Sequence, residues 1–215
     1  MSTDAIKDVS ERLVKAGKEL WENGLVRGTS GNISAKIPDA DAFLIKPSGA
    51  RMKNLKPEEL VLVDMQGNKI RGTMNVSLET PIHAAIYRAR KDVQAVVHTH
   101  APTATAFGIA KMEILPLQVE VFLFLPNGVP VVPFEPPGSE ALAVAVQKRM
   151  TKYDAVILEN HGIVTISSTI EAACNLNEMV EEAAKIQLMA MTLASRDAFD
   201  LAKLKEKFKT ENTVE

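Results

Sequence analysis

Short apolar runs alternate with segments of helical periodicity along the chain, and this alternation restricts the folds that it can adopt. Short runs rich in Val, Ile, Leu and Ala are typical of buried strands. Apolar residues that recur at helical spacing are typical of helices that cover a sheet. Several of the expected strands are separated only by short turns, which parallel neighbours do not allow. The pattern therefore predicts an α/β fold with three layers, α/β/α, around a central mixed, largely antiparallel sheet.

The expected elements follow one another without an internal repeat or a linker, so we expect a single domain over residues 1–215. Strands are expected at residues 33–37, 42–46, 60–64, 93–98, 155–158 and 163–166. Helices are expected at residues 6–20, 80–91, 103–111, 139–149 and 168–195. The last helix begins with Ser168-Thr169-Ile170-Glu171, which matches a capping box.

Composition and charge exclude several classes of protein. The apolar fraction of 46% and the charged fraction of 24% are those of an ordinary globular protein. A formal net charge of −2 with mixed signs favours neither a nucleic acid nor an anionic membrane as partner. The apolar stretches are too short to span a bilayer, and the N-terminus has no apolar signal core. Because the single cysteine, Cys174, cannot form an internal disulfide, we expect a cytoplasmic protein.

Three of the four histidines directly follow apolar strand candidates. His98 and His100 are two positions apart, so in an extended strand their imidazoles point to one face, roughly 7 Å apart along the chain. His161 lies in Asn160-His161-Gly162, where Gly162 would let the backbone turn sharply. Three imidazoles with one open position describe a catalytic zinc site. Spacing alone also allows hydrogen-bonded structural histidines at strand ends.

A second candidate site is the segment Gly28-Thr29-Ser30-Gly31-Asn32, which precedes a strand. Its glycines expose backbone N–H groups, and Thr29 and Asn32 add side-chain donors, a combination that suits an anion. The segment matches neither a Walker A loop nor a dinucleotide fingerprint. Taken by itself it is more typical of a plain loop.

A series of motifs in matching order and spacing resembles the class II aldolase/adducin family, and the resemblance runs from Gly24 to about Ala190. Among the family's enzymes the chain looks most like L-fuculose-phosphate aldolase, with L-ribulose-5-phosphate 4-epimerase as a close relative. The motifs are Gly28-Thr29-Ser30-Gly31-Asn32-Ile33-Ser34, Lys46-Pro47-Ser48-Gly49, Ser77-Leu78-Glu79 with His83, Ala95-Val96-Val97-His98-Thr99-His100, and Asn160-His161-Gly162.

The resemblance implies a zinc (Zn2+) site with His98, His100 and His161 as ligands, completed by Glu79. It also implies that Glu79 is the catalytic base, which exchanges a proton beside the substrate carbonyl through an enediolate. Taken by itself, Glu79 is more typical of a surface acid in a helix first turn. His83, one helical turn later, is expected to orient its surroundings rather than to bind metal.

The resemblance further implies which residues contact the substrate phosphate. One departure from the family is Leu78, which stands where relatives that bind phosphate commonly have a second serine. The loss of this hydroxyl would weaken phosphate binding or signal a different anionic group. The expected substrate-binding residues are Gly28, Thr29, Asn32, Ser48, Gly49 and Ser77.

The reaction implied by the family is zinc-dependent cleavage of a ketose 1-phosphate, such as L-fuculose 1-phosphate, to dihydroxyacetone phosphate and an aldehyde. Glu79 favours the aldolases, because the epimerase has Asp there, whereas Lys46-Pro47-Ser48-Gly49 and Thr80-Pro81 look more like the epimerase. A decarboxylase or dehydratase of a phosphorylated sugar acid and a non-enzymatic, adducin-like binding module are further alternatives. The intact histidines argue against the binding module. Family members are commonly homotetramers with active sites at subunit interfaces, which we expect here too.

The proton donor to the aldehyde oxygen is open. In the fuculose enzyme a tyrosine after the histidine pair has this role, whereas the tyrosines of this chain are Tyr87 and Tyr153. Glu120, in the apolar run 119–125, is either the donor or an exposed strand residue.

Overall fold

The computed structural model describes residues 2–194 and 199–210, which fold around one eight-stranded sheet. All neighbouring strands are antiparallel except β6 and β7, which are parallel, so the predicted mixed, largely antiparallel sheet is confirmed. In spatial order the strands are β4 (Lys69–Arg71), β3 (Val61–Asp64), β2 (Ala42–Ile45), β1 (Asn32–Lys36), β5 (Ala95–Thr99), β8 (Gly162–Ser167), β7 (Ala155–Leu158) and β6 (Val131–Val132).

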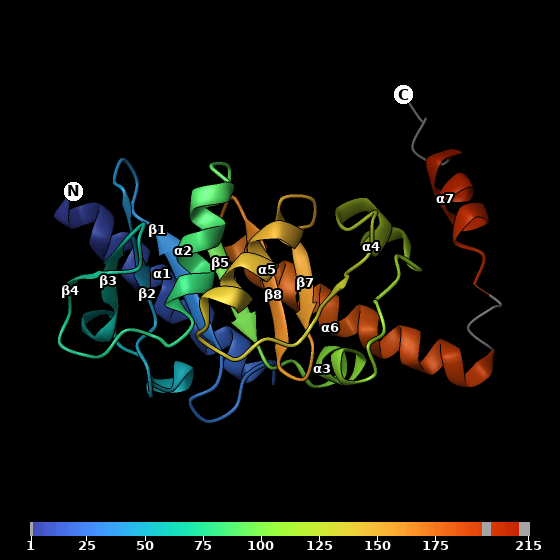
Figure 1. Ribbon diagram of the computed structural model, residues 1–215, viewed down its shortest axis with the longest axis horizontal. Helices are drawn as coiled ribbons and strands as arrows, with labels where there is room; N and C mark the ends of the chain where they lie inside the picture. Colours follow the sequence, from blue (N-terminus) through green and yellow to red (C-terminus); the bar gives the residue numbers. More distant parts are fainter. Residues whose placement is uncertain (1, 195–198, 211–215) are drawn as a thin grey trace.

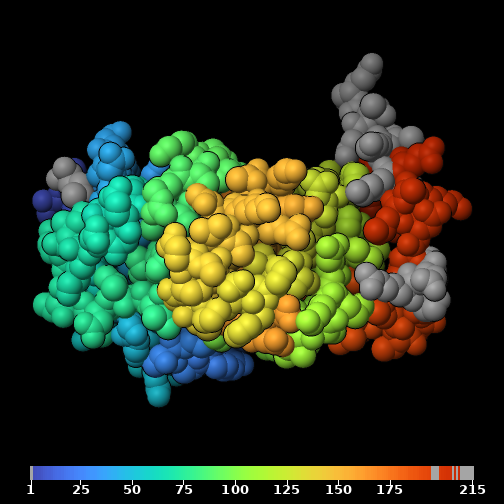
Figure 2. Space-filling model, in the orientation of Figure 1, coloured from blue at the N-terminus to red at the C-terminus, as the bar shows by residue number. Residues whose placement is uncertain are grey.

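Helices cover both faces of this sheet, which confirms the three-layer arrangement (Figure 1). One face carries α1 (Thr3–Glu22), α3 (Pro102–Ile109) and α6 (Ile170–Leu193). The other carries α2 (Thr80–Ala89) and α5 (Glu140–Met150), which lie side by side on the face seen in Figure 2. Two 3-10 turns, η1 (Met52–Asn54) and η2 (Pro57–Glu59), pack against α1. The remaining helices are α4 (Val119–Phe124) and α7 (Leu201–Thr210).

The central strands form because both of their faces are covered. In β5, Ala95 and Val97 pack into the core beneath α1 and α6, whereas Val96 packs into the core beneath α2 and α5. A strand buried on both sides reads as a continuous apolar run rather than as an alternating one. This is why the runs of β5, β7 and β8 were visible in the sequence.

One local expectation is wrong and one strand was missed, because local composition does not report what packs against a segment. The run 119–125 forms helix α4 and not a strand, with Val121 buried and Glu120 exposed. Strand β4 was not expected, because all its side chains are exposed and it carries no apolar pattern.

Helix α6 begins one residue later than the capping-box sequence indicates. Its N-cap is Thr169, whose hydroxyl oxygen accepts a hydrogen bond from the Ala172 N–H at 3.1 Å. Glu171 does not close the box but forms an ion pair with Arg12 on α1 at 2.8 Å. The helix ends at Leu193, and the predicted end at Ser195 lies outside the described residues.

The sheet topology brings three distant segments to one edge. Thr99 pairs with Ile163 and Leu158 pairs with Gly162, so the carboxyl ends of β5 and β7 meet the beginning of β8. On the other side of β5, His98 pairs with Asn32 at the beginning of β1.

Among the described helices, none combines the length and the apolar character that crossing a bilayer requires.

Candidate active site

Three histidines converge at this edge of the sheet. His98 is the second-last residue of β5, His100 is the first residue after that strand, and His161 lies in the turn between β7 and β8. One ring nitrogen from each lies within 4.8 Å of the others. The ring centroids are 4.8 to 5.1 Å apart. The structure thus brings the three predicted ligands together, in an arrangement that could hold a metal ion.

The hydrogen bonds of His98 leave a nitrogen lone pair facing the cluster. Its Nδ1–H donates to the carbonyl of Ile163 at 2.9 Å, so Nε2 carries no proton in the neutral ring. This Nε2 lies 3.1 Å from Nε2 of His100. Lone pairs so close repel each other unless a proton or a cation lies between them. The donor set fits a divalent metal that accepts imidazole nitrogen, zinc among them.

Glu79 is buried and faces the histidines, which excludes the alternative of a surface acid. Its Oε2 lies 3.1 Å from Nε2 of His98, and its Oε1 lies 3.2 Å from Nε2 of His161. Among the described residues, Oε1 finds no hydrogen-bond donor of normal geometry, as expected for an oxygen that faces a cation. Burial opposes ionisation, but the neighbouring histidines outweigh it and hold the pKa of Glu79 well below its usual range. The group is therefore a carboxylate at neutral pH.

The histidines respond differently to their surroundings. Burial opposes protonation of His98, but the Glu79 carboxylate more than compensates and raises the pKa of His98. Burial lowers the pKa of His100 to about 4, and the charges of His98 and His161 act in the same direction. The pKa of His161 is also lowered, again mainly by burial. His100 and His161 are thus neutral at pH 7, as metal ligands must be.

The turn that carries His161 differs from the expected one. The left-handed residue is Asn160, with a φ of 58°, and not Gly162. Gly162 is required for space instead, because a Cβ there would lie 2.2 Å from the Thr99 carbonyl oxygen and 3.0 Å from the His100 ring. The missing side chain allows the turn to approach the histidine pair closely.

The predicted phosphate-binding segments are tied to one another beside this cluster. Nζ of Lys46 donates to the Thr29 carbonyl at 3.1 Å, and the Ser48 N–H donates to the Asn75 carbonyl at 3.0 Å. The Glu79 N–H donates to Oγ of Ser77 at 3.3 Å. Gly28, Thr29, Ser48 and Gly49 are exposed, whereas Asn32 and Ser77 are buried.

The side chain of Asn32 is directed into the protein rather than toward the exposed loop. Its Nδ2 donates to Oε2 of Glu79 at 2.7 Å, and its Oδ1 contacts Nε2 of His83. Only the second N–H of this amide remains for a ligand. His83 lies outside the histidine cluster, its two ring nitrogens contact Ser34 and Asn32, and burial lowers its pKa to about 3.

Sequence reasoning assigned no role to Lys46. Its side chain is buried at the end of β2, and burial lowers its pKa to about 8, with the Glu79 carboxylate acting in the opposite direction. The sequence feature that could have pointed to Lys46 is its position directly after an apolar strand. The buried ammonium places a positive charge directly beneath the exposed Gly28–Thr29 segment.

None of the three candidate proton donors is brought to the histidines within the described chain. Tyr87 is buried and its hydroxyl is bonded to Ser34. Tyr153 precedes β7, whereas His161 follows it, so the two lie at opposite ends of that strand. Glu120 is exposed on α4.

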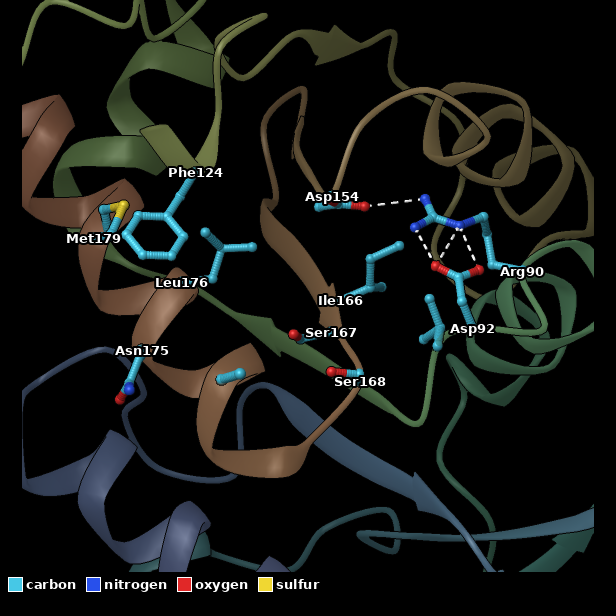
Figure 3. A pocket seen from close by; sticks show the side chains of 12 residues that line it. Arg90, Asp92, Phe124, Asp154, Ile166, Ser167, Ser168, Asn175, Leu176 and Met179 are labelled. Atoms are coloured by element: carbon cyan, nitrogen blue, oxygen red, sulfur yellow. Dashed lines mark hydrogen bonds and ion pairs between the residues drawn. The ribbon is translucent and has the colours of Figure 1, made fainter. Parts of the chain in front are cut away.

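A separate pocket of about 480 Å³ lies at the opposite edge of the sheet (Figure 3). Arg90 bridges Asp92 at 2.7 Å and Asp154 at 3.0 Å along one wall, and Phe124 and Met179 line the other. No histidine lines this pocket, so it is distinct from the histidine cluster.

Comparison with known proteins identifies the class to which this fold and site belong. The model of the class II aldolase and adducin N-terminal domain family matches residues 11–188. The chain therefore belongs to this family, which confirms the resemblance, and it is an enzyme of the class II aldolase type, a carbon–carbon lyase.

Individual relatives carry different substrate names. The chain is 35% identical over 176 residues to 5-deoxy-D-ribulose 1-phosphate aldolase of Bacillus thuringiensis serovar kurstaki, with 82% of each chain covered. It is 31% identical over 182 residues to 3-oxo-tetronate 4-phosphate decarboxylase of Haemophilus influenzae, covering 82% of this chain and 85% of the relative. A solved L-fuculose 1-phosphate aldolase superposes with a TM-score of 0.84 at 30% identity, covering 97% of this chain and 98% of the other.

Proposed function

We propose that the protein is a zinc-dependent aldolase that cleaves a ketose 1-phosphate to dihydroxyacetone phosphate and an aldehyde. The observation that carries this proposal is the buried carboxylate of Glu79, which faces His98 at 3.1 Å and His161 at 3.2 Å. An ionised carboxylate beside a cluster of imidazoles that can bind a metal is the combination that metal-assisted proton transfer at carbon requires. The relatives named as ketose-phosphate aldolases support the same reaction.

His98, His100 and His161 would hold the Zn2+, and Glu79 would complete the site before substrate enters. When bound, the metal supplies Lewis-acid stabilisation of the negative charge that develops on the substrate oxygens.

Glu79 moves the proton at carbon. In the cleavage direction the C4 hydroxyl passes its proton to water, the C3–C4 bond breaks, and its electron pair stays with C3 while C4 becomes the aldehyde carbon. The Glu79 carboxylate takes up one proton from water and then donates it to C3, which completes dihydroxyacetone phosphate. In the synthetic direction the Glu79 carboxylate removes the same proton, consistent with its lowered pKa.

The exposed segment at Gly28, Thr29, Ser48 and Gly49, with Ser77 and the second N–H of Asn32, would bind the substrate phosphate. Lys46 supports this assignment, because its buried ammonium donates to the backbone of that segment. The lowered pKa of Lys46 means that this charge is present below pH 8 and is lost as the pH rises through about 8.

The Lys46 charge predicts a pH dependence of anion binding. We expect inorganic phosphate to inhibit the enzyme less well as the pH rises through about 8, because the free enzyme then loses the Lys46 charge. In Lys46→Met we expect about 10-fold weaker inhibition at pH 7 and little further change up to pH 9. Inhibition constants between pH 6.5 and 9.5 measure this. The matched control is Lys152→Met, an exposed lysine at the other edge of the sheet, which should follow the parent. The same decline with pH in Lys46→Met would contradict the assignment.

Proton exchange tests the proposed reaction without knowledge of the aldehyde. Zinc-loaded protein is incubated with dihydroxyacetone phosphate alone in heavy water, and NMR follows the hydroxymethyl carbon. We expect stereospecific replacement of one hydrogen, dependent on metal and on Glu79. Absence of exchange in folded, zinc-loaded protein would contradict the aldolase proposal.

A second candidate is decarboxylation of a phosphorylated 3-keto sugar acid. The relative named 3-oxo-tetronate 4-phosphate decarboxylase supports it, as does the lost hydroxyl at Leu78, which is exposed beside Glu79. Carbon dioxide release from 3-oxo-tetronate 4-phosphate, without exchange in dihydroxyacetone phosphate, would favour this candidate over the aldolase.

The predicted homotetramer in the cytoplasm also stays a proposal. Exposed apolar side chains on two helices support an assembly in which copies of the chain cover them. They are Val119, Leu123 and Phe124 on α4 and Leu188, Met189 and Leu193 on α6.

A further inference from the structure

A buried chain of hydrogen bonds leads from Tyr87, in the last turn of α2, through β1 to the carboxylate of Glu79. The Tyr87 hydroxyl contacts Oγ of Ser34 at 2.7 Å, and this Oγ contacts Nδ1 of His83 at 2.6 Å. Nε2 of His83 contacts Oδ1 of Asn32, whose Nδ2 donates to Oε2 of Glu79 at 2.7 Å. All five side chains are buried, Ser34 and His83 completely.

Because the Glu79 carboxylate can only accept, the donor and acceptor of each hydrogen bond in this series can be assigned. The Glu79 carboxylate only accepts, so the Asn32 amide must present Nδ2 to it and Oδ1 to His83. Oδ1 in turn needs a donor, so His83 carries its proton on Nε2. Nδ1 of His83 then accepts from the Ser34 hydroxyl, whose oxygen accepts from Tyr87.

We propose that His83 is a positioning residue, which acts through Asn32 to hold the Glu79 carboxylate in its catalytic orientation. This inference rests on the proposed role of Glu79 as the base. The two ends of an asparagine amide have nearly the same shape, so packing alone does not select between them. The reversed amide would present an oxygen to the Glu79 carboxylate at hydrogen-bond distance and repel it. The N–H on Nε2 of His83 removes that alternative.

The register of the sheet places the Asn32 contact beside the histidine cluster. Asn32 pairs with His98 across β1 and β5, so the strand that carries Asn32 is bonded to the strand that carries a predicted ligand. Glu79 is the N-cap of α2, and His83 lies one turn further along the same helix. The position of the Glu79 carboxylate relative to His98 is therefore fixed by two elements: α2 carries Glu79, and β1 carries Asn32, which donates to it.

This series of hydrogen bonds does not connect Glu79 to solvent and so does not act as a proton relay. Its far end is Tyr87, which is 1% exposed and packs against Phe43 with ring centroids 5.0 Å apart. Burial raises the pKa of Tyr87 further above its ordinary value, so the phenol does not release its proton. Orientation of the carboxylate is what remains for the chain to do.

Substitution of His83 separates positioning from folding. In His83→Leu we expect the saturated rate of proton exchange in dihydroxyacetone phosphate to fall about 10- to 100-fold, with its half-saturating concentration nearly unchanged. In His83→Gln we expect recovery to within about 5-fold of the parent, because an amide N–H again donates to Asn32. Zinc content should stay at the parental level in both variants, since His83 lies outside the cluster.

The matched pair Ser34→Ala and Thr165→Val controls for the loss of a buried hydroxyl. Both hydroxyls are completely buried and hydrogen-bonded, but Thr165 bonds to Asn177 and the Ala173 carbonyl on the α6 side. We expect comparable losses of melting temperature in both variants, and a lower exchange rate only in Ser34→Ala. If His83→Leu and Ser34→Ala exchange as fast as Thr165→Val, the positioning role is wrong.

Nitrogen NMR of the zinc-loaded parent gives a readout independent of activity. We expect a neutral His83 ring with its proton on Nε2 and an unprotonated Nδ1, and a mixed tautomer in Ser34→Ala. A proton on Nδ1 in the parent would overturn the inference. Failure of the proposed function gives a different result from failure of this inference. If Glu79 is not the base, Glu79→Gln exchanges the protons of dihydroxyacetone phosphate at the parental rate, whatever the His83 variants do.

Discussion

Glu79→Gln is expected to lower the rate of proton exchange in dihydroxyacetone phosphate by about 10²–10⁴-fold, the usual range for loss of a general base. The amide has the same shape and its oxygen still accepts from Asn32, but it does not take up the substrate proton. Metal should stay bound, because three imidazoles remain. Exchange rates by NMR and zinc content of the purified variant measure the two effects separately.

The control for this substitution is Glu159→Gln. Glu159 lies in the turn next to His161 but pairs with Lys111 at 2.9 Å, away from the histidines. We expect its exchange rate to stay within about 3-fold of the parent, as for a surface ion pair. A near-parental rate in Glu79→Gln would rule out Glu79 as the base.

His98→Ala is expected to remove both the metal and the activity. The parent should bind about one zinc per chain, as a three-histidine site does. Removal of the most deeply buried of the three imidazoles leaves two nitrogens and one carboxylate, and we expect less than about a tenth of the parental zinc content after dialysis. Metal analysis by mass spectrometry measures this directly.

His83→Gln supplies the matched control, because His83 is also a buried histidine but uses both ring nitrogens on Ser34 and Asn32. It should keep its zinc. Parental zinc content in His98→Ala would mean that the ligand assignment is wrong.

Local patterns were sufficient where one strand or one short motif carries the whole signal. The pairing of His98 with His100 depends only on the two-residue period of an extended strand, and both rings do meet on one face. The runs at β5, β7 and β8 were recognisable because strands covered on both faces are continuously apolar.

Local patterns failed where a segment's structure depends on what packs against it. Residues 119–125 have a strand-like composition, yet they form α4, whose Phe122 stacks with Phe208 of α7 at 5.1 Å. The distant contact decides the conformation of so short a segment, because its intrinsic preference is weak. The exposed strand β4 was missed for the opposite reason, since it has a partner strand but all its side chains, Ile70 included, are exposed and form no apolar pattern.

By itself the sequence determined the layered fold, the family, and the candidate metal ligands, because each depends on short-range patterns of residue type. Only the tertiary structure decided what surrounds them. The amide of Asn32 is committed to Glu79, 47 positions away, and the hydroxyl of Tyr87 to Ser34, 53 positions away. Lys46 is buried beneath the exposed Gly28–Thr29 segment, and both tyrosines lie away from the histidines. These outcomes depend on hydrogen bonds and burial between distant segments, which no local period encodes.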